Sequence, residues 1–301
     1  MDASRPPLHI ALVVPFLDEE THLPTFLASL AAQTRPPDRV LLVDDGSADA
    51  SVELARAFAA EHAWATALER PRRAAARDRL AQAPELQAFT WAADHLDARY
   101  DVIAKVDADL DLAPSVLAGL EAAFVADPAL GLAGVVLHSA GDDGVLRPER
   151  VPSYHVRGAT KFYRRACLEQ ISPIPTILGW DTIDEVHARR LGWTTRSFAF
   201  DGPPTVHLRP RGAHDGVVRG FRRWGECAWA YGADPVGVLA GSVRRMRQRP
   251  YVVGGLNYLA GWGLAALRGV PRADPHVRAF CRQEQRLRMR RAIARRAGAA
   301  A

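Results

Sequence analysis

An apolar run that ends in two carboxylates constrains this 301-residue chain more than any other stretch. Residues 102–106 (VIAKV) are largely apolar and β-branched, and Asp107 and Asp109 follow them two positions apart. Such a run predicts a buried strand of an α/β sheet, a fold class whose ligands bind at the carboxyl ends of the strands. Two carboxylates there suit Mg²⁺ or Mn²⁺ that also holds phosphate oxygens. For an isolated Asp-x-Asp, turn or helix-start residues are the simpler explanation, so the rest of the chain must decide.

The flanking sequence alternates strand patterns with helix patterns. Apolar runs predict strands, and apolar residues at helical spacing predict the helices between them. Strand–helix–strand crossovers favour parallel pairing. We therefore expect an α/β domain with a mostly parallel sheet over residues 1–210 and a basic, aromatic helical region over 211–301. The expected strands are 9–14, 39–43, 65–68, 102–106, 132–137 and 194–200, and the expected helices include 50–60, 86–96, 166–171 and 179–191.

Polar loops also follow the first two strands. Asp18 and Glu20 come after the first strand, and Asp44 and Asp45 end the second one, where Gly46 can take the positive φ of a tight turn. A basic stretch over residues 70–79 is either a solvated helix surface or a loop that meets a diphosphate.

A third acidic group opens the helix expected at 179–191. Asp181, Asp184 and Glu185 in its first turns suit the positive end of a helix dipole. The same position also suits a general base that takes a proton from an acceptor hydroxyl. His207 follows a late strand near the same end of the sheet, where an imidazole can complete a metal site, although a lone histidine is more often structural.

The excess of positive charge, a net +5 for the whole sequence, is concentrated in the last third of the chain. Residues 251–267 are apolar but broken by glycines, which favours helices lying on a membrane, with a buried helical hairpin as the alternative. The last helix is expected to begin with Asp274 as N-cap and Pro275 at the first position. Its arginines fit an anionic membrane surface better than nucleic acid, because no nucleic-acid-binding motif accompanies them.

The cysteine pattern and the N-terminus bear on the compartment. Three cysteines lie far apart with no CxxC, which argues against a zinc site or a disulfide scaffold and fits a reducing compartment. The first residues do not have the pattern of a signal peptide. We therefore expect a cytoplasmic protein, peripheral at the cytoplasmic face of the membrane.

Four pieces of the sequence, taken in order, resemble family 2 glycosyltransferases of the GT-A fold. They read VVPFLDEE at 13–20, DDGS at 44–47, DAD at 107–109 and WDTIDE at 180–185. The resemblance covers roughly residues 8–210, and the region after it looks like the membrane-associated tail of some members. It implies a nucleoside-diphosphate sugar as donor and Mg²⁺ or Mn²⁺ as cofactor.

The resemblance also implies a role for each matched residue. Asp109 would ligate the metal, and His207 could be a further ligand. Asp181, Asp184 or Glu185 would be the catalytic base: counting back from Gly192 favours Asp181, whereas matching the acidic pair favours Asp184 and Glu185. The nucleotide would meet Pro15, Asp18 and Glu20 at the base and ribose, Asp44 and Asp45 in the base pocket, Arg77 at the base or diphosphate, and Asp107 at the ribose.

The implied reaction is one displacement at the anomeric carbon, which inverts that centre, with a hydroxyl of a glycan or lipid-linked glycan as acceptor. Such an enzyme would serve polysaccharide biosynthesis. A nucleotidyltransferase also uses paired carboxylates and Mg²⁺, but the acidic segment 18–20 has the wrong charge for a phosphate-binding loop near the first strand. A catalytically silent membrane scaffold would be expected to lose these acids, and all of them are present.

Overall fold

The computed structural model describes residues 7–71, 80–96, 100–141, 143–149, 151–209, 216–247 and 250–298. The strands are β1 Ile10–Phe16, β2 Arg39–Asp44, β3 Ala65–Glu69, β4 Val102–Val106, β5 Leu110–Asp111, β6 Leu130–Val135, β7 Leu137–Ala140, β8 Leu146–Pro148, β9 Thr160–Arg164, β10 Thr194–Phe198 and β11 Thr205–His207. The helices are α1 Leu23–Ala31, α2 Ser51–Glu61, the 3₁₀ helix η1 Leu80–Gln82, α3 Pro84–Ala93, α4 Val116–Ala126, α5 Arg165–Ile171, α6 Trp180–Arg190, α7 Gly216–Ala230, α8 Pro235–Arg245, α9 Val253–Leu267 and α10 Pro275–Gly298.

The chain divides into two compact units. The first comprises Met1–Arg79, Ala83–Ser172 and Leu191–Arg211, and the second comprises Leu80–Gln82, Pro173–Arg190 and Gly212–Ala301. All the strands belong to the first unit, and α6 belongs with the C-terminal helices in the second.

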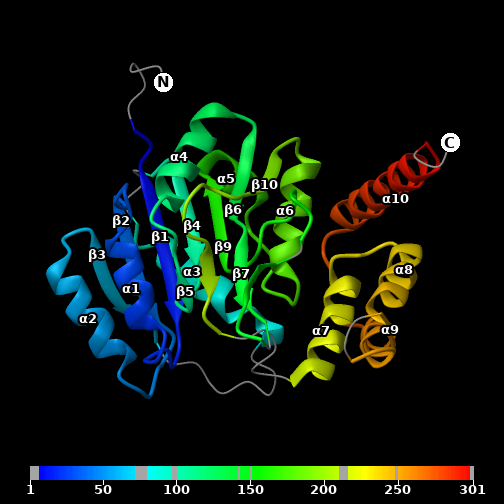
Figure 1. Ribbon diagram of the computed structural model, residues 1–301, viewed down its shortest axis with the longest axis horizontal. Helices are drawn as coiled ribbons and strands as arrows, with labels where there is room; N and C mark the ends of the chain where they lie inside the picture. Colours follow the sequence, from blue (N-terminus) through cyan, green and yellow to red (C-terminus); the bar gives the residue numbers. More distant parts are fainter. Residues whose placement is uncertain are drawn as a thin grey trace. The chain divides into compact units, whose positions relative to one another are not determined.

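A seven-stranded sheet organises the first unit, in the order β10-β6-β9-β4-β1-β2-β3 (Figure 1). Its pairs are parallel except those that β9 makes with β4 and β6, so the expected mostly parallel sheet is confirmed. Every residue of β1 is buried, because helices cover both faces of the sheet and remove its apolar side chains from water. Leu12 faces a cluster with Phe26 of α1 and Phe124 of α4, and burying each such side chain stabilises the fold by roughly 1.5–3 kcal/mol.

Two features of this sheet were not predicted. β9 was not expected as a strand, and it lies antiparallel between β4 and β6. The single strand expected at 132–137 is two strands, because the Val136 N–H donates to the carbonyl of Phe198 (2.8 Å) and the chain passes there from the large sheet to a small one. The small sheet has the order β5-β11-β7-β8.

Close helix contacts build the second unit. α7 packs on α9 through Gly225 and Gly261, where a Cβ would lie 2.0 Å from a carbonyl oxygen of the opposite helix. Tyr258, Gly254, Gly255 and Gly261 of α9 are buried, so part of the apolar run 251–267 packs inside the protein, as in the hairpin alternative. Among the described helices, none combines the length and the apolar character that crossing a membrane requires.

The last helix begins as the sequence predicts. The N–H of His276 donates to Oδ1 of Asp274 (2.8 Å), which satisfies an N–H that the helix itself leaves unpaired. α10 packs on α6 through a cluster that includes Ile183 and Val277. Arg189 of α6 also forms an ion pair with Glu284 of α10 (2.8 Å).

Candidate active site

The carboxyl ends of β1, β2 and β4 lie at one edge of the large sheet. Phe16 pairs with Asp44, and Val13 pairs with Lys105, so the segments that follow these strands start side by side. This brings together the loop after β1, the turn after β2 and the Asp-x-Asp after β4. Polar residues gather where open α/β sheets bind their ligands.

The loop after β1 is tied to the turn after β2. Asp18 has φ 52°, a left-handed conformation that Asp and Asn tolerate better than most residues. Its Oδ1 accepts from the Ala48 N–H (2.8 Å), and Glu20 Oε2 accepts from the Ala50 N–H (3.1 Å). Both side chains therefore hold the loop that would border a nucleotide, whereas Pro15 is buried within β1.

The two acids after β2 differ in their partners. The Asp44 carboxylate is buried and accepts the N–H groups of Gly46 and Ser47, each at 2.9 Å, so it shapes the turn. Asp45 forms an ion pair with the buried Arg70 (2.8 Å). Arg77 lies outside the described residues.

A buried lysine holds the first acid of the Asp-x-Asp. Lys105 of β4 donates from Nζ to Oδ1 of Asp107 and to the carbonyl of Gly158 (3.1 Å). Burial by itself lowers the pKa of Lys105, but the charges of Asp107, Glu85 and Asp109, with the hydrogen bond to Asp107, together outweigh burial and raise the pKa, so the lysine stays cationic. Asp107 thus has a fixed cation on one side.

The second acid lies against a histidine from a distant strand. β11 pairs antiparallel with β5, which places His207 opposite Leu110, the residue after Asp109. His207 Nε2 lies 3.4 Å from Asp109 Oδ2, and Arg209 Nε lies 3.8 Å from the same oxygen. The expectation that His207 lies near the same end of the sheet as Asp109 agrees with this geometry.

Charged neighbours shift the pKa values of Asp109 and His207 in the direction opposite to the effect of burial. Burial tends to raise the pKa of Asp109, but His207, Arg209 and Lys105 hold it below its ordinary value. Burial likewise lowers the pKa of His207, but the adjacent carboxylates of Asp109 and Glu149 and the charge of Asp107 raise it to about 9. Glu19 behaves in the opposite way: burial raises its pKa to about 7 although Arg209 lies 2.5 Å away.

The pair fits a divalent cation. Oδ1 of Asp109 is buried and accepts no hydrogen bond from the described residues, so one carboxylate oxygen has capacity for another ligand. No cluster of three or more potential metal ligands occurs among the described residues. A carboxylate and an imidazole are a small set, which suits Mg²⁺ or Mn²⁺ because these ions are commonly bound by one or two protein groups together with substrate phosphates.

The three base candidates lie on α6 in the second unit. Asp184 and Glu185 are buried; Asp184 Oδ1 accepts from the Glu185 N–H (2.6 Å), and Glu185 lies 3.7 Å from Arg189. Asp181 is half-buried. Of the three, only Asp181 keeps substantial contact with solvent.

The comparisons with known proteins identify one family. A family model described as Glycosyl transferase family 2 matches residues 11–176, which is more than half of the chain. The chain belongs to this family. It is a glycosyltransferase, which favours that reaction over the nucleotidyltransferase and scaffold alternatives.

Three solved structures share the fold of this family 2 chain, which is GT-A-like. PcManGT, a mannosyltransferase from Pyrobaculum calidifontis in complex with GDP-Man and Mn²⁺, is 18% identical with TM-score 0.56, and the match covers 96% of this chain and 81% of that one. S. aureus TarS 1–349 in complex with UDP-GlcNAc is 15% identical with TM-score 0.51 and coverages of 87% and 73%. Glucosyl-3-phosphoglycerate synthase from Mycobacterium tuberculosis, with Mg²⁺ and UDP, is 16% identical with TM-score 0.51 and coverages of 72% and 77%. No curated protein sequence matches this glycosyltransferase closely enough to count as a relative.

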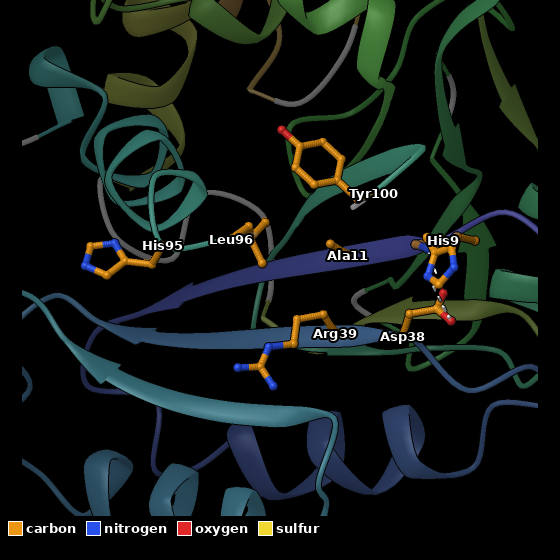
Figure 2. Close-up of a pocket in the computed structure, with 8 residues that line it drawn as sticks. His9, Ala11, Asp38, Arg39, His95, Leu96 and Tyr100 are labelled. Atoms are coloured by element: carbon orange, nitrogen blue, oxygen red, sulfur yellow. Dashed lines mark hydrogen bonds and ion pairs between the residues drawn. The ribbon is translucent and has the colours of Figure 1, made fainter. Parts of the chain in front are cut away.

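A pocket at the opposite edge of the sheet is separate from this site. The pocket lies at the amino ends of β1 and β2 (Figure 2). Its volume is about 510 Å³. His9, Asp38, His95 and Tyr100 are among the residues that line it, and no predicted site residue does. Its position at the amino ends of parallel strands is the wrong edge for the donor site of a GT-A-like fold.

Four residues of the glycosyltransferase site were not predicted: Lys105, Glu19, Arg209 and Glu149. Lys105 carried a signal, because it is the one charged residue inside the apolar run 102–106 and lies two positions before Asp107. Arg209 lies two positions after His207, the spacing that puts two strand residues on one face. Nothing in the local pattern marked Glu149, which reaches the site through the small sheet.

Proposed function

We propose that this glycosyltransferase uses a nucleoside-diphosphate sugar as donor and a divalent cation held by Asp109 and His207. The observation that carries the proposal is the pairing of the buried Asp109 with the half-buried His207 at the carboxyl edge of the sheet, in which Oδ1 of Asp109 accepts no hydrogen bond from the described residues. The solved relatives with Mn²⁺, Mg²⁺, GDP-Man and UDP-GlcNAc support this choice of ligands.

Each residue of the site has a defined task in the proposal. A bound cation would offset the negative charge that develops on the leaving diphosphate. Lys105 would hold Asp107 in place beside the donor through the contact between its Nζ and Oδ1 of Asp107. Arg209, which now faces Glu19 and Asp109, supplies a second positive charge at the same edge. Asp44 and the loop after β1 shape the nucleotide pocket through their backbone hydrogen bonds.

Asp181 is the proposed general base. A base must reach the acceptor hydroxyl, and Asp184 and Glu185 are buried with polar partners of their own. In the proposed reaction, Asp181 takes the proton as the acceptor oxygen attacks the anomeric carbon and the nucleoside diphosphate leaves. This single displacement inverts the anomeric centre. An acceptor hydroxyl on a glycan or lipid-linked glycan, and with it a role in polysaccharide biosynthesis, stays a prediction.

Ligand-induced stabilisation tests the donor and the metal together. We would measure the melting temperature with UDP, GDP, CDP, dTDP or ADP, each with and without Mn²⁺, because a ligand that binds only the folded state raises its stability. We expect one nucleotide to stabilise the protein in a Mn²⁺-dependent way and Asp109→Ala to lose the Mn²⁺ dependence. If no nucleotide stabilises a well-folded sample, the scaffold alternative is favoured.

Contact with an anionic membrane surface is a second part of the proposal. Residues 235–273 contain six arginines and no acid. Within this segment, exposed apolar side chains cluster near the start of α9, among them Tyr251, Val252 and Leu256, and Arg247 near them is exposed too. Apolar side chains flanked by cations are the pattern of a surface that lies on anionic lipid.

Flotation with vesicles tests this part. We expect binding to vesicles that contain phosphatidylglycerol and no binding to phosphatidylcholine alone. Val252→Glu should weaken binding, whereas Val145→Glu should not, although Val145 and Val252 are each 52% exposed. Equal effects of the two substitutions, or binding independent of lipid charge, would contradict the membrane assignment.

A further inference from the structure

Glu149 is a buried carboxylate that the proposed reaction does not use. It follows β8 in the small sheet and is 6% exposed. A buried carboxylate is expensive to keep ionised unless cations and hydrogen-bond donors surround it. Its surroundings therefore indicate what it does.

Two side chains and the backbone hold Glu149 in place. Ser139 Oγ donates to Oε1 (2.6 Å), and Arg157 forms an ion pair with Oε2 (2.7 Å). The backbone N–H of Glu149 donates to the carbonyl of Leu137 (2.7 Å). These partners come from β7 and from the segment before β9, so two separate parts of the chain hold Glu149 in place.

The same carboxylate faces the histidine of the proposed metal site. His207 Nδ1 lies 3.5 Å from Glu149 Oε1, while Nε2 lies 3.4 Å from Asp109 Oδ2. The imidazole therefore lies between two carboxylates, one on each ring nitrogen. A histidine that ligates a metal through one nitrogen usually donates its other N–H to a partner that sets the ring orientation.

The small sheet sets this geometry. β11 pairs with β7, which places Val206 beside His138, and β7 pairs with β8, which places Ser139 beside Arg147. His207, Ser139 and Glu149 thus come from neighbouring strands of one sheet, or from the residue directly after one. This strand order places Glu149 on the Nδ1 side of the His207 ring.

We infer that Glu149 is a positioning residue: in the metal-bound protein it would accept the Nδ1–H of His207, a buried nitrogen that makes no hydrogen bond among the described residues, and so would leave the Nε2 lone pair for the metal that Asp109 also holds. The inference rests on the proposed function, since it concerns the same metal site. It adds Ser139 and Arg157 as the groups that hold Glu149 for this task.

Metal affinity is the first test. Mn²⁺ binding would be measured by electron paramagnetic resonance of free Mn²⁺ in the presence of UDP or GDP, with no acceptor and no turnover. We expect Glu149→Gln to weaken Mn²⁺ binding by about 10–100-fold, the usual effect of losing such a partner. Glu121→Gln is the matched control, because Glu121 is a partly buried carboxylate that likewise pairs with an arginine, Arg35, in the same unit.

The histidine itself supplies a readout that a purely structural role would not move. In the Mg²⁺–UDP or Mg²⁺–GDP complex, ¹⁵N chemical shifts report which ring nitrogen of His207 carries the proton. We expect Nδ1–H alone in the natural protein and in Glu121→Gln, and a mixture in Glu149→Gln. Glu149→Asp should restore part of the preference.

The outcomes separate the inference from the proposed function. If the natural protein binds no Mn²⁺ with either nucleotide, the proposed metal site fails and this inference fails with it. If it binds Mn²⁺ and Glu149→Gln binds equally well with an unchanged tautomer, only the role of Glu149 is overturned. Should Glu149→Gln not fold, Ser139→Ala takes its place: we expect a few-fold loss of Mn²⁺ affinity, and no loss would overturn the inference.

Discussion

The packing of α7 on α9 makes a prediction that two pairs of glycines can test. A Cβ at Gly225 would lie 2.0 Å from the carbonyl oxygen of Tyr258, and a Cβ at Gly261 would lie 2.0 Å from that of Arg222. Gly220 on α7 and Gly263 on α9 have open space at the same position. Each helix therefore offers a glycine in tight contact with the other helix and a glycine in open space for comparison.

The magnitudes follow from two opposing effects. Replacing a helical glycine by alanine stabilises the helix by about 1 kcal/mol, so Gly220→Ala and Gly263→Ala should raise the free energy of unfolding by about that amount. Gly225→Ala and Gly261→Ala gain the same propensity but force two backbones apart, and such overpacking costs about 1–3 kcal/mol. The gain in helix propensity is the same for both variants on one helix. Their free energies of unfolding should therefore differ by about 1–3 kcal/mol, and this difference measures the steric cost alone.

Urea unfolding followed by tryptophan fluorescence is the assay, since Trp224, Trp229 and Trp262 lie on these two helices. The midpoint should move up for Gly220→Ala and Gly263→Ala relative to Gly225→Ala and Gly261→Ala. If the members of a pair shift the midpoint equally, the close approach of α7 and α9 is wrong.

Three further predictions concern the acids and a thiol. Asp181→Asn should lower kcat of sugar transfer by about 10²–10⁴-fold with nucleotide binding retained, whereas Asp184→Asn should mainly lower the melting temperature; the reverse pattern would exclude Asp181 as the base. Burial raises the pKa of Glu19 from 4.5 to about 7, so the folded state keeps a proton that the unfolded state releases, and stability should fall by up to about 3 kcal/mol as pH rises from 4.5 to 7. Unfolding measured across that range should show a flatter profile for Glu19→Gln, and an equal slope would contradict the assignment. Burial raises the pKa of Cys281 to about 12, so this thiol should resist iodoacetamide at pH 8 until the protein unfolds, and rapid labelling mapped by mass spectrometry would show that it is accessible.

The elements that the sequence predicts well are those whose signal is local. β1, β2 and β4 are mostly apolar runs, as expected for strands that are buried on both faces of a sheet. β9 escaped prediction because its five residues include Lys161 and Arg164. Lys161 is nevertheless fully buried, an environment that depends on the strands on either side.

The same distinction between local signals and contacts with distant segments applies to the candidate site. Strand ends marked Asp44, Asp107 and Asp109, since a carboxylate directly after a buried strand lies at the edge where ligands bind. Whether each acid faces a ligand or a protein partner could not be predicted from the sequence. Asp44 is occupied by the turn it caps, and Asp109 keeps one oxygen without a hydrogen-bond partner among the described residues.

By itself, the sequence determined which chemical groups stand at the ends of the strands and that a parallel sheet would gather them. The tertiary structure alone decided their partners: Arg209 reaches Glu19 across 190 residues of chain, and Glu149 reaches His207 through the small sheet. The physical reason is that burial and charge pairing depend on segments far apart in the sequence. A local sequence pattern indicates which residue needs a partner, and only the folded chain shows which residue that partner is.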